Sequence, residues 1–159
     1  TCLATCKSAS SPSTPTAQRN SHVVPLCCGS PLPREIILVV EDDSRVRRLT
    51  IKRLKLIGYR VLEASDGPTA LEILKRGEPV DLVFTDLIMP GGLSGRDVAL
   101  QAREIRPGIK VLLTSGYAEE LVRGDDMQRE NLKVLRKPYQ QTDLVAALRD
   151  VFANGDQST

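Results

Sequence analysis

The feature that most restricts the fold of this chain is an alternation of two sequence patterns that begins at residue 35. Short runs rich in Val, Ile and Leu alternate with longer segments in which apolar residues recur at helical spacing. Such short runs are typical of parallel strands that are buried on both faces. Repeated strand–helix units predict an α/β fold, a doubly wound five-stranded parallel sheet flanked by helices. The expected strands span residues 36–40, 59–63, 80–85, 109–114 and 132–136.

Helix signals lie between the predicted strands. The first helix is expected to be capped by Asp43 or Ser44 and to end at Gly58. Asp66 and Ser94 are expected to cap the next two helices, and the last helix is expected over residues 141–152. The predicted buried face of the first helix consists of Val46, Leu49, Thr50, Leu54 and Ile57.

Composition limits the possible functions. The net charge is +2, and residues 1–33 contain Lys7 and Arg19 but no acidic residue, so the charges of the remaining chain balance. A balanced domain gives no electrostatic reason to expect contact with nucleic acid or with an anionic membrane. No apolar run approaches the roughly 20 residues that a membrane-spanning helix needs. We therefore expect a cytoplasmic domain, and the sequence specifies no oligomeric state.

The first 33 residues differ from the rest of the chain. Ser, Thr, Pro and Cys make up more than half of them, which predicts a flexible leader or linker. The spacing of the cysteines in this segment matches no zinc signature, and the cysteines are expected to be reduced. The predicted organisation is this leader at 1–33, one folded domain at 34–153 and a disordered tail at 154–159. The four cysteines are Cys2, Cys6, Cys27 and Cys28.

Polar residues follow four of the predicted strands, at the ends where a parallel sheet binds ligands. Asp86 stands at the carboxyl end of the third strand, directly after residue 85, and Glu41 and Asp42 follow the first strand; Ser115 follows the fourth strand and Lys137 the fifth. Crowded carboxylates repel one another, and Mg²⁺ suits one or two carboxylates together with waters and a phosphate. An ammonium and a hydroxyl could then contact phosphoryl oxygens. The pattern indicates phosphoryl chemistry at a magnesium site; the alternative is a solvated cluster of ion pairs.

Four motifs make the chain similar to a known family. The motifs are Val39-Val40-Glu41-Asp42-Asp43, Thr85-Asp86-Leu87-Ile88-Met89-Pro90, Leu113-Thr114-Ser115-Gly116 and Arg136-Lys137-Pro138. In the order and spacing of these motifs, the residues from about Arg34 to Ala153 resemble the receiver domain of two-component response regulators. The resemblance implies a flavodoxin-like fold with strand order 2-1-3-4-5, for which a receiver is a standard example.

The resemblance also implies roles for individual residues. Asp86 would accept a phosphoryl group from a histidine kinase or a His-phosphotransfer domain, with Ser115 as the switch hydroxyl and Lys137 against the phosphoryl oxygens. Asp42, Asp86 and the backbone carbonyl of Ile88 would bind Mg²⁺, and Glu41 would hold the ion through water. The Lys137–Pro138 peptide bond is expected to be cis. The domain would be a signalling switch with slow self-catalysed phosphorylation and dephosphorylation, not a metabolic enzyme.

Three positions depart from the commonest family pattern. The loop from Gly91 to Gly95 is one residue longer than in many receivers, and Val134 replaces a switching aromatic residue, which puts an aromatic relay in doubt. Gly116 follows Ser115 where a small side chain, often Ala, is common. This glycine predicts easy access of water to the phosphoryl group and a short-lived phosphorylated state.

Other functions make different demands on the sequence. A phosphohydrolase of the haloacid-dehalogenase type also uses Asp and Mg²⁺, but it needs a second Asp two residues after the nucleophile, where this chain has Ile88. A module that only docks partners has no need of the acidic set and Lys137. The motifs favour a receiver that is part of a hybrid histidine kinase; the parent protein would then be a histidine kinase. The alternative is a stand-alone single-domain response regulator.

Overall fold

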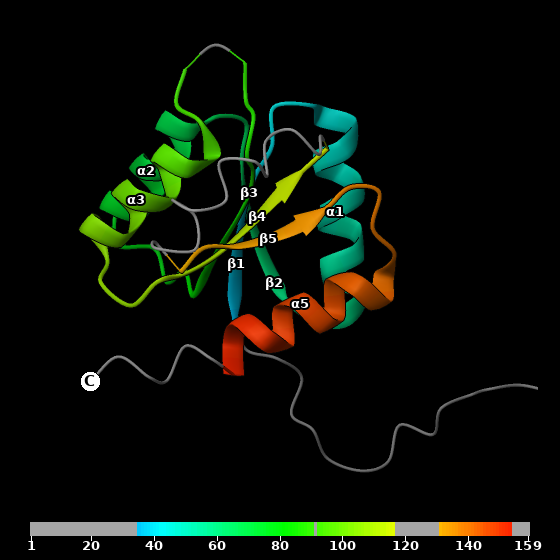
Figure 1. Cartoon of the computed structure of the whole chain (residues 1–159). Helices are drawn as coiled ribbons and strands as arrows, with labels where there is room; N and C mark the ends of the chain where they lie inside the picture. Colours follow the sequence, from blue (N-terminus) through cyan, green and yellow to red (C-terminus); the bar gives the residue numbers. More distant parts are fainter. Residues whose placement is uncertain (1–34, 91, 117–130, 154–159) are drawn as a thin grey trace, which may run out of the picture.

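The computed structural model describes residues 35–90, 92–116 and 131–153, which form alternating strands and helices (Figure 1). All pairings within the five-stranded sheet are parallel, and the strand order is β2-β1-β3-β4-β5. The predicted fold class and strand order are both confirmed. The elements are β1 (Ile36–Val40), α1 (Ser44–Ile57), β2 (Arg60–Ala64), α2 (Gly67–Lys75), β3 (Leu82–Asp86), α3 (Gly95–Ile105), β4 (Lys110–Ser115), β5 (Lys133–Arg136) and α5 (Gln141–Ala153).

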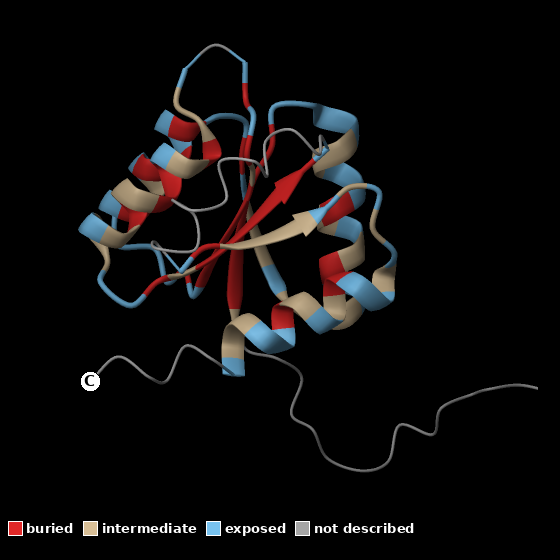
Figure 2. Cartoon of the chain, viewed as in Figure 1, coloured by how far each residue is buried: buried red, intermediate tan, exposed pale blue. Residues whose placement is uncertain are grey.

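The helices cover the two faces of the sheet, with α2 and α3 on one side and α1 and α5 on the other (Figure 1). Successive residues of a strand point to opposite faces. In β1, Leu38 and Val40 belong to the apolar core beneath α2 and α3, whereas Ile37 and Val39 belong to the core beneath α1 and α5. Figure 2 shows this arrangement as buried central strands and a buried stripe along each helix.

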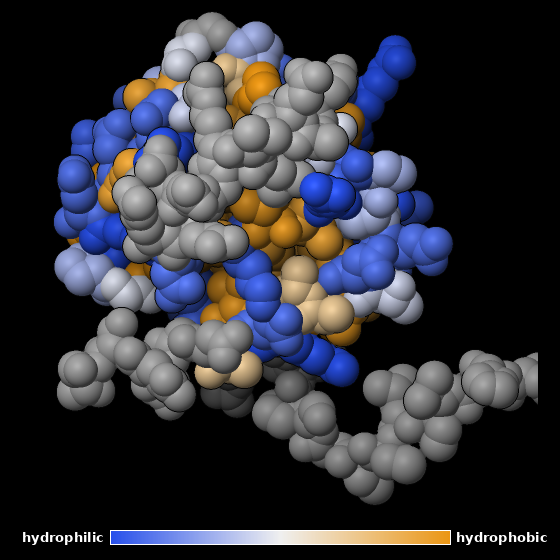
Figure 3. All heavy atoms as spheres, viewed as in Figure 1, coloured by the Kyte–Doolittle hydropathy of each residue, from blue (hydrophilic) through white to orange (hydrophobic). Residues whose placement is uncertain are grey.

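On the face seen in Figure 3, hydrophilic residues surround an area of hydrophobic residues near the middle. The edge strand β5 contributes half-buried residues on that side. Within the described ranges, no helix is both long enough and apolar enough to cross a lipid bilayer.

Helix caps explain where the helices begin and end. The Asp43 carboxylate accepts hydrogen bonds from the backbone N–H groups of Arg45 and Val46, so Asp43 rather than Ser44 is the first cap. Gly58 ends α1 with a φ of 112°, a left-handed conformation that glycine adopts without strain. The predicted caps Asp66 and Ser94 are both observed, and Ser94 forms a capping box with Asp97.

The prediction that Leu49 of α1 is a core residue is wrong. Leu49 is 51% exposed, whereas Thr50 and Leu54 are buried. Successive helical residues are rotated by about 100°, and the buried arc is centred on Thr50, Leu54 and Ile57. Leu49 therefore lies on the outer side of the helix. Strand ends also differ slightly from prediction: β3 begins at Leu82 rather than Val80 and includes Asp86.

Candidate functional site

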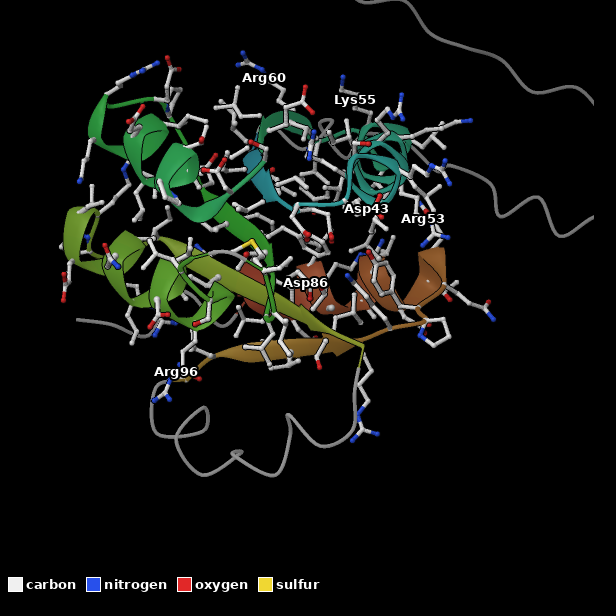
Figure 4. The ribbon with its side chains drawn as sticks, turned by 90° about the horizontal axis from the view of Figure 1, so that it is seen from above. Asp43, Arg53, Lys55, Arg60, Asp86 and Arg96 are labelled. Atoms are coloured by element: carbon white, nitrogen blue, oxygen red, sulfur yellow. The ribbon has the colours of Figure 1, made fainter. Side chains whose placement is uncertain are left out.

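The predicted site residues meet at the carboxyl edge of the sheet. Asp86 is the last residue of β3, and its neighbours β1 and β4 place Glu41 and Ser115 at the same edge. Figure 4 looks down on this edge, with Asp86 near the middle of the view and Asp43 at the start of α1 beside it. Parallel strands thus bring together side chains that are up to 96 positions apart in sequence.

Lys137 connects two of the carboxylates. Its ammonium nitrogen lies 2.7 Å from an Asp86 carboxylate oxygen and 3.1 Å from an oxygen of Glu41. The backbone N–H of Lys137 donates to the carbonyl of Ser115 at 2.8 Å, which attaches the segment after β5 to the end of β4. The Lys137–Pro138 peptide bond is cis, as expected. One cation therefore bridges the ends of β1 and β3.

Burial and charge shift two pKa values at this edge. Burial raises the pKa of Glu41 above its ordinary value, and the charge and hydrogen bond of Lys137 only partly counteract it. Burial lowers the pKa of Lys137, but its hydrogen bond and attraction to Asp86 and Glu41 outweigh that effect, and the net pKa is raised. Lys137 is therefore held in its charged form beside the carboxylates.

The three consecutive acidic residues after β1 have different surroundings. Glu41 is 6% exposed and contacts Lys137, whereas Asp43 caps α1. Hydrogen bonds from the backbone of Arg45 and Val46 lower the pKa of the Asp43 carboxyl. Asp42 is exposed, and its carboxylate has no ion pair or hydrogen bond within the described ranges. Asp42 is thus the acidic residue of this loop that is available to a ligand.

The two hydroxyl residues at the end of β4 are also in different environments. The Thr114 hydroxyl is buried and lies 3.5 Å from the backbone carbonyl of Thr85, to which it donates. Ser115 is 2% exposed and is the residue whose carbonyl accepts from Lys137. The Thr114 hydroxyl is thus engaged within the sheet, and Ser115 stays the predicted ligand-facing hydroxyl.

The oxygen donors at this edge fit Mg²⁺. No three His, Cys, Asp or Glu side chains within the described ranges are placed to bind a metal together. Mg²⁺ does not need such a cage, because it keeps several waters and is commonly held by one or two carboxylates. Repulsion from both Asp86 and Asp42 contributes to the raised pKa of Glu41, so three carboxylates share one electrostatic cluster with one ammonium. A divalent cation would balance the remaining negative charge.

Gly95 allows the start of α3 to pack directly on Asp86. A Cβ atom at position 95 would lie 2.0 Å from the Asp86 carbonyl oxygen, closer than any real contact, and the Gly95 N–H already donates to the Leu87 carbonyl at 2.9 Å. The close approach requires glycine here. It fixes the backbone that carries the Asp86 carboxylate.

We expect Gly95→Ala to destabilise the domain by about 1–3 kcal/mol, or more, because backbone atoms must move to admit the methyl group. Urea denaturation followed by circular dichroism measures the change. Gly92→Ala is the matched control, since a Cβ atom at position 92 has no neighbour within 4 Å. Equal stabilities of the two variants would contradict the proposed packing role.

Sequence reasoning missed one residue at this edge. The Arg47 guanidinium donates to the backbone carbonyl of Glu41 at 2.7 Å and lies 3.4 Å from a carboxylate oxygen of Glu63. Its position among six basic residues of α1 gave no signal, since such residues are usually solvated. Helical spacing places Arg47, one turn before Ile51 and next to Val46, at the border of the buried face, but it does not indicate the contacts with Glu41 and Glu63.

Val134, which replaces the switching aromatic residue expected from the family, is half-buried and packs against the core beneath α2 and α3. Tyr117, the neighbouring residue that could substitute for this aromatic, lies outside the described residues.

The family model for the response regulator receiver domain matches residues 37–149. The chain is 38% identical over 109 residues to the response regulator receiver protein CpdR of Brucella abortus, a match covering 69% of this chain and 89% of CpdR. It is 32% identical over 121 residues to the sensor kinase CckA of the same organism, covering 76% of this chain but only 13% of CckA.

Solved structures give the same result. A response regulator receiver domain from Clostridium thermocellum is similar with a TM-score of 0.69 and 30% identity, covering 76% of this chain and 95% of that one. The receiver domain of the hybrid histidine kinase CckA is similar with a TM-score of 0.60 and 32% identity, covering 72% and 96%. The strand order, the acidic edge with its bridging lysine and these matches agree: the chain belongs to the response regulator receiver domain family of two-component systems.

Proposed function

We propose that Asp86 is the phosphoacceptor of a two-component phosphorelay and takes its phosphoryl group from a histidine of a kinase or phosphotransfer protein. The observation that carries this proposal is the contact of Lys137 with both Asp86 and Glu41 at the carboxyl edge of the sheet. This contact holds an ammonium beside a half-buried carboxylate where charge would develop during phosphoryl transfer. A structural ion pair alone would not need the exposed Asp42 carboxylate next to it.

In the proposed reaction, an Asp86 carboxylate oxygen attacks the phosphorus atom of the donor. A phosphorus–oxygen bond forms, the phosphorus–nitrogen bond to the donor histidine breaks, and the imidazole leaves with the bonding electron pair. Lys137 stabilises the phosphoryl oxygens. Asp42, Asp86 and the Ile88 carbonyl would hold Mg²⁺, with Glu41 acting through water; the ion supplies further charge neutralisation to the transferred group.

Phosphorylation adds negative charge and acceptor oxygens next to the end of β4. We propose that the Ser115 hydroxyl then donates to the phosphoryl group and biases the residues after β4 toward a second conformation. Water later hydrolyses the acyl phosphate. The domain acts as a signalling switch with slow self-catalysed phosphorylation and dephosphorylation, which separates it from a turnover phosphohydrolase.

The lifetime of the phosphorylated state depends on the side chain at position 116. Gly116 is exposed, and a Cβ atom there would meet no described atom within 4 Å, so the start of a side chain can be added at this position. We expect Gly116→Thr to lengthen the half-life of phospho-Asp86 by shielding it from water. Loss of label after removal of the donor measures the effect. A half-life no longer than that of the parent would contradict it.

The domain is proposed to span residues 34–153, preceded by a leader or linker and followed by a short tail, in a cytoplasmic protein. Similarity to the receiver of CckA supports a place in a hybrid histidine kinase. The alternative, a stand-alone response regulator, is favoured by the match to 89% of the length of CpdR. The mass of the full-length protein isolated from cells distinguishes the two.

The proposal is tested by incubating the chain with acetyl phosphate and Mg²⁺, followed by intact-mass spectrometry and peptide mapping of the acyl phosphate. We expect one phosphoryl group on Asp86 and loss of labelling when Mg²⁺ is chelated. A module that only docks partners would take no label, and a phosphohydrolase would release phosphate continuously without accumulating it. Labelling that is independent of Mg²⁺, or located elsewhere, would overturn the proposal.

A further inference from the structure

We infer that Arg47 is a positioning residue for the metal site: it fixes the loop after β1 so that the Asp42 carboxylate is presented at the sheet edge. The inference rests on the proposed function. Arg47 contacts neither Asp42's carboxylate nor Asp86; it acts through the backbone and through Glu63.

The geometry places the Arg47 guanidinium against the backbone of the loop. One of its terminal nitrogens is 2.7 Å from the Glu41 carbonyl oxygen and 3.4 Å from that of Asp42. The last paired residue of β1 is Val40, opposite Ala64, so both carbonyls lie beyond the ladder between β1 and β2. Glu41 is buried, and a buried carbonyl without a partner is costly, so Arg47 provides the Glu41 carbonyl with a charged donor just beyond the end of the ladder.

The other side of the guanidinium is held by β2. The Arg47 Nε atom lies 3.4 Å from a Glu63 carboxylate oxygen, and the arginine side chain is 18% exposed while that of Glu63 is 62% exposed. The planar guanidinium has donors in a fixed fork, so it can bind the loop and the β2 carboxylate together. The result is a bridge from the edge strand to the loop that carries Asp42.

This bridge orients the loop for metal binding. With its carbonyls directed at Arg47, the loop leaves the Glu41 side chain toward Lys137 and the Asp42 side chain exposed. Groups that orient metal ligands without touching the metal commonly change metal affinity by about 10–100-fold when mutated. We expect an effect of this size at Arg47.

Charge and positioning predict opposite results for Arg47→Gln. Removing a positive charge close to a cation site would, by electrostatics alone, tighten Mg²⁺ binding. Loss of the loop contacts would instead weaken it, and we expect weakening of about 10–100-fold. Arg48→Gln is the matched control, because Arg48 is exposed on the same helix and its Nε donates to the Ser44 carbonyl within α1, not to the carbonyls of Glu41 or Asp42. It should leave Mg²⁺ affinity unchanged or slightly increased.

Two measurements are made on each variant: Mg²⁺ titration of the unphosphorylated chain by NMR of backbone amides, and the Mg²⁺ concentration giving half-maximal labelling by acetyl phosphate. Arg47→Lys, which keeps the charge but not the fork, should recover part of the affinity; it also serves as the test variant if Arg47→Gln does not fold. Affinity in both Arg47 variants equal to or tighter than in Arg48→Gln would overturn the inference. Failure of the parent chain to take up phosphate would instead count against the proposed function.

Discussion

Replacing Asp86 by Asn is expected to abolish phosphate incorporation from acetyl phosphate. An amide is not a nucleophile toward phosphorus under these conditions, and the change also removes one of the two carboxylates proposed to bind Mg²⁺. The fold should persist, because Asn has nearly the same shape and Lys137 keeps its contact with Glu41. Intact-mass spectrometry after incubation with donor and Mg²⁺ checks the result.

A matched control for this variant is Asp66→Asn. Asp66 is an exposed carboxylate that caps α2, and Asn caps helices as well as Asp does. This control makes the same chemical change away from the sheet edge, so it should label like the parent. Undiminished labelling of the Asp86 variant, with the label located on another residue, would show that the acceptor has been wrongly assigned.

Lys137→Gln is expected to slow phosphorylation of Asp86 by about 10²–10³-fold. Removing one preorganised donor from a developing oxyanion typically has an effect of this size, and here the donor also carries a charge. The initial rate of labelling at saturating Mg²⁺ measures the change. Lys133→Gln is the matched control, because Lys133 forms an ion pair with Asp150 that is largely exposed and lies away from the carboxyl ends of the strands. A similar rate loss in both variants would argue against a specific role for Lys137.

The same substitution should change how stability depends on pH. Burial raises the pKa of Glu41 in the folded protein, so stability decreases as pH rises from the ordinary carboxyl pKa, about 4.3, through the raised value. Lys137→Gln removes the attraction that opposes this shift, so the raised pKa increases further. The difference in melting temperature between parent and variant should therefore grow from about pH 4 to pH 7. Melting curves of both proteins at several pH values test this expectation. A melting-temperature difference that does not change with pH would contradict the coupling between Glu41 and Lys137.

The sequence was sufficient for features that depend on local rules. Asp66 and Ser94 were predictable as helix caps because short polar side chains satisfy the first free N–H groups of a helix. The carboxyl-edge position of Asp86 followed from the short apolar run before it. The strand order was available only through the resemblance to receivers, since the pattern of elements alone allows several arrangements of a parallel sheet.

Other features depend on tertiary geometry that no local pattern specifies. Leu49 has helical spacing suited to burial, yet the way α1 lies on the sheet leaves it outside. Arg47 looks like its basic neighbours on α1 until β2 places Glu63 beside it. The need for glycine at position 95 likewise depends on how closely α3 approaches the end of β3. In each case the deciding contact joins residues from different elements.

The tight packing of Gly95 on the backbone of Asp86 has a consequence for signal transmission. Because the first turn of α3 and the end of β3 leave no room between them, the backbone on that side of Asp86 is held in place by packing. On the opposite side, the Lys137 N–H donates to the Ser115 carbonyl just beyond the last β4–β5 pair, Ser115 with Arg136, and a Cβ atom at Gly116 would meet nothing within 4 Å. We therefore expect a conformational change triggered by phosphorylation of Asp86 to leave α3 in place and to displace the ends of β4 and β5.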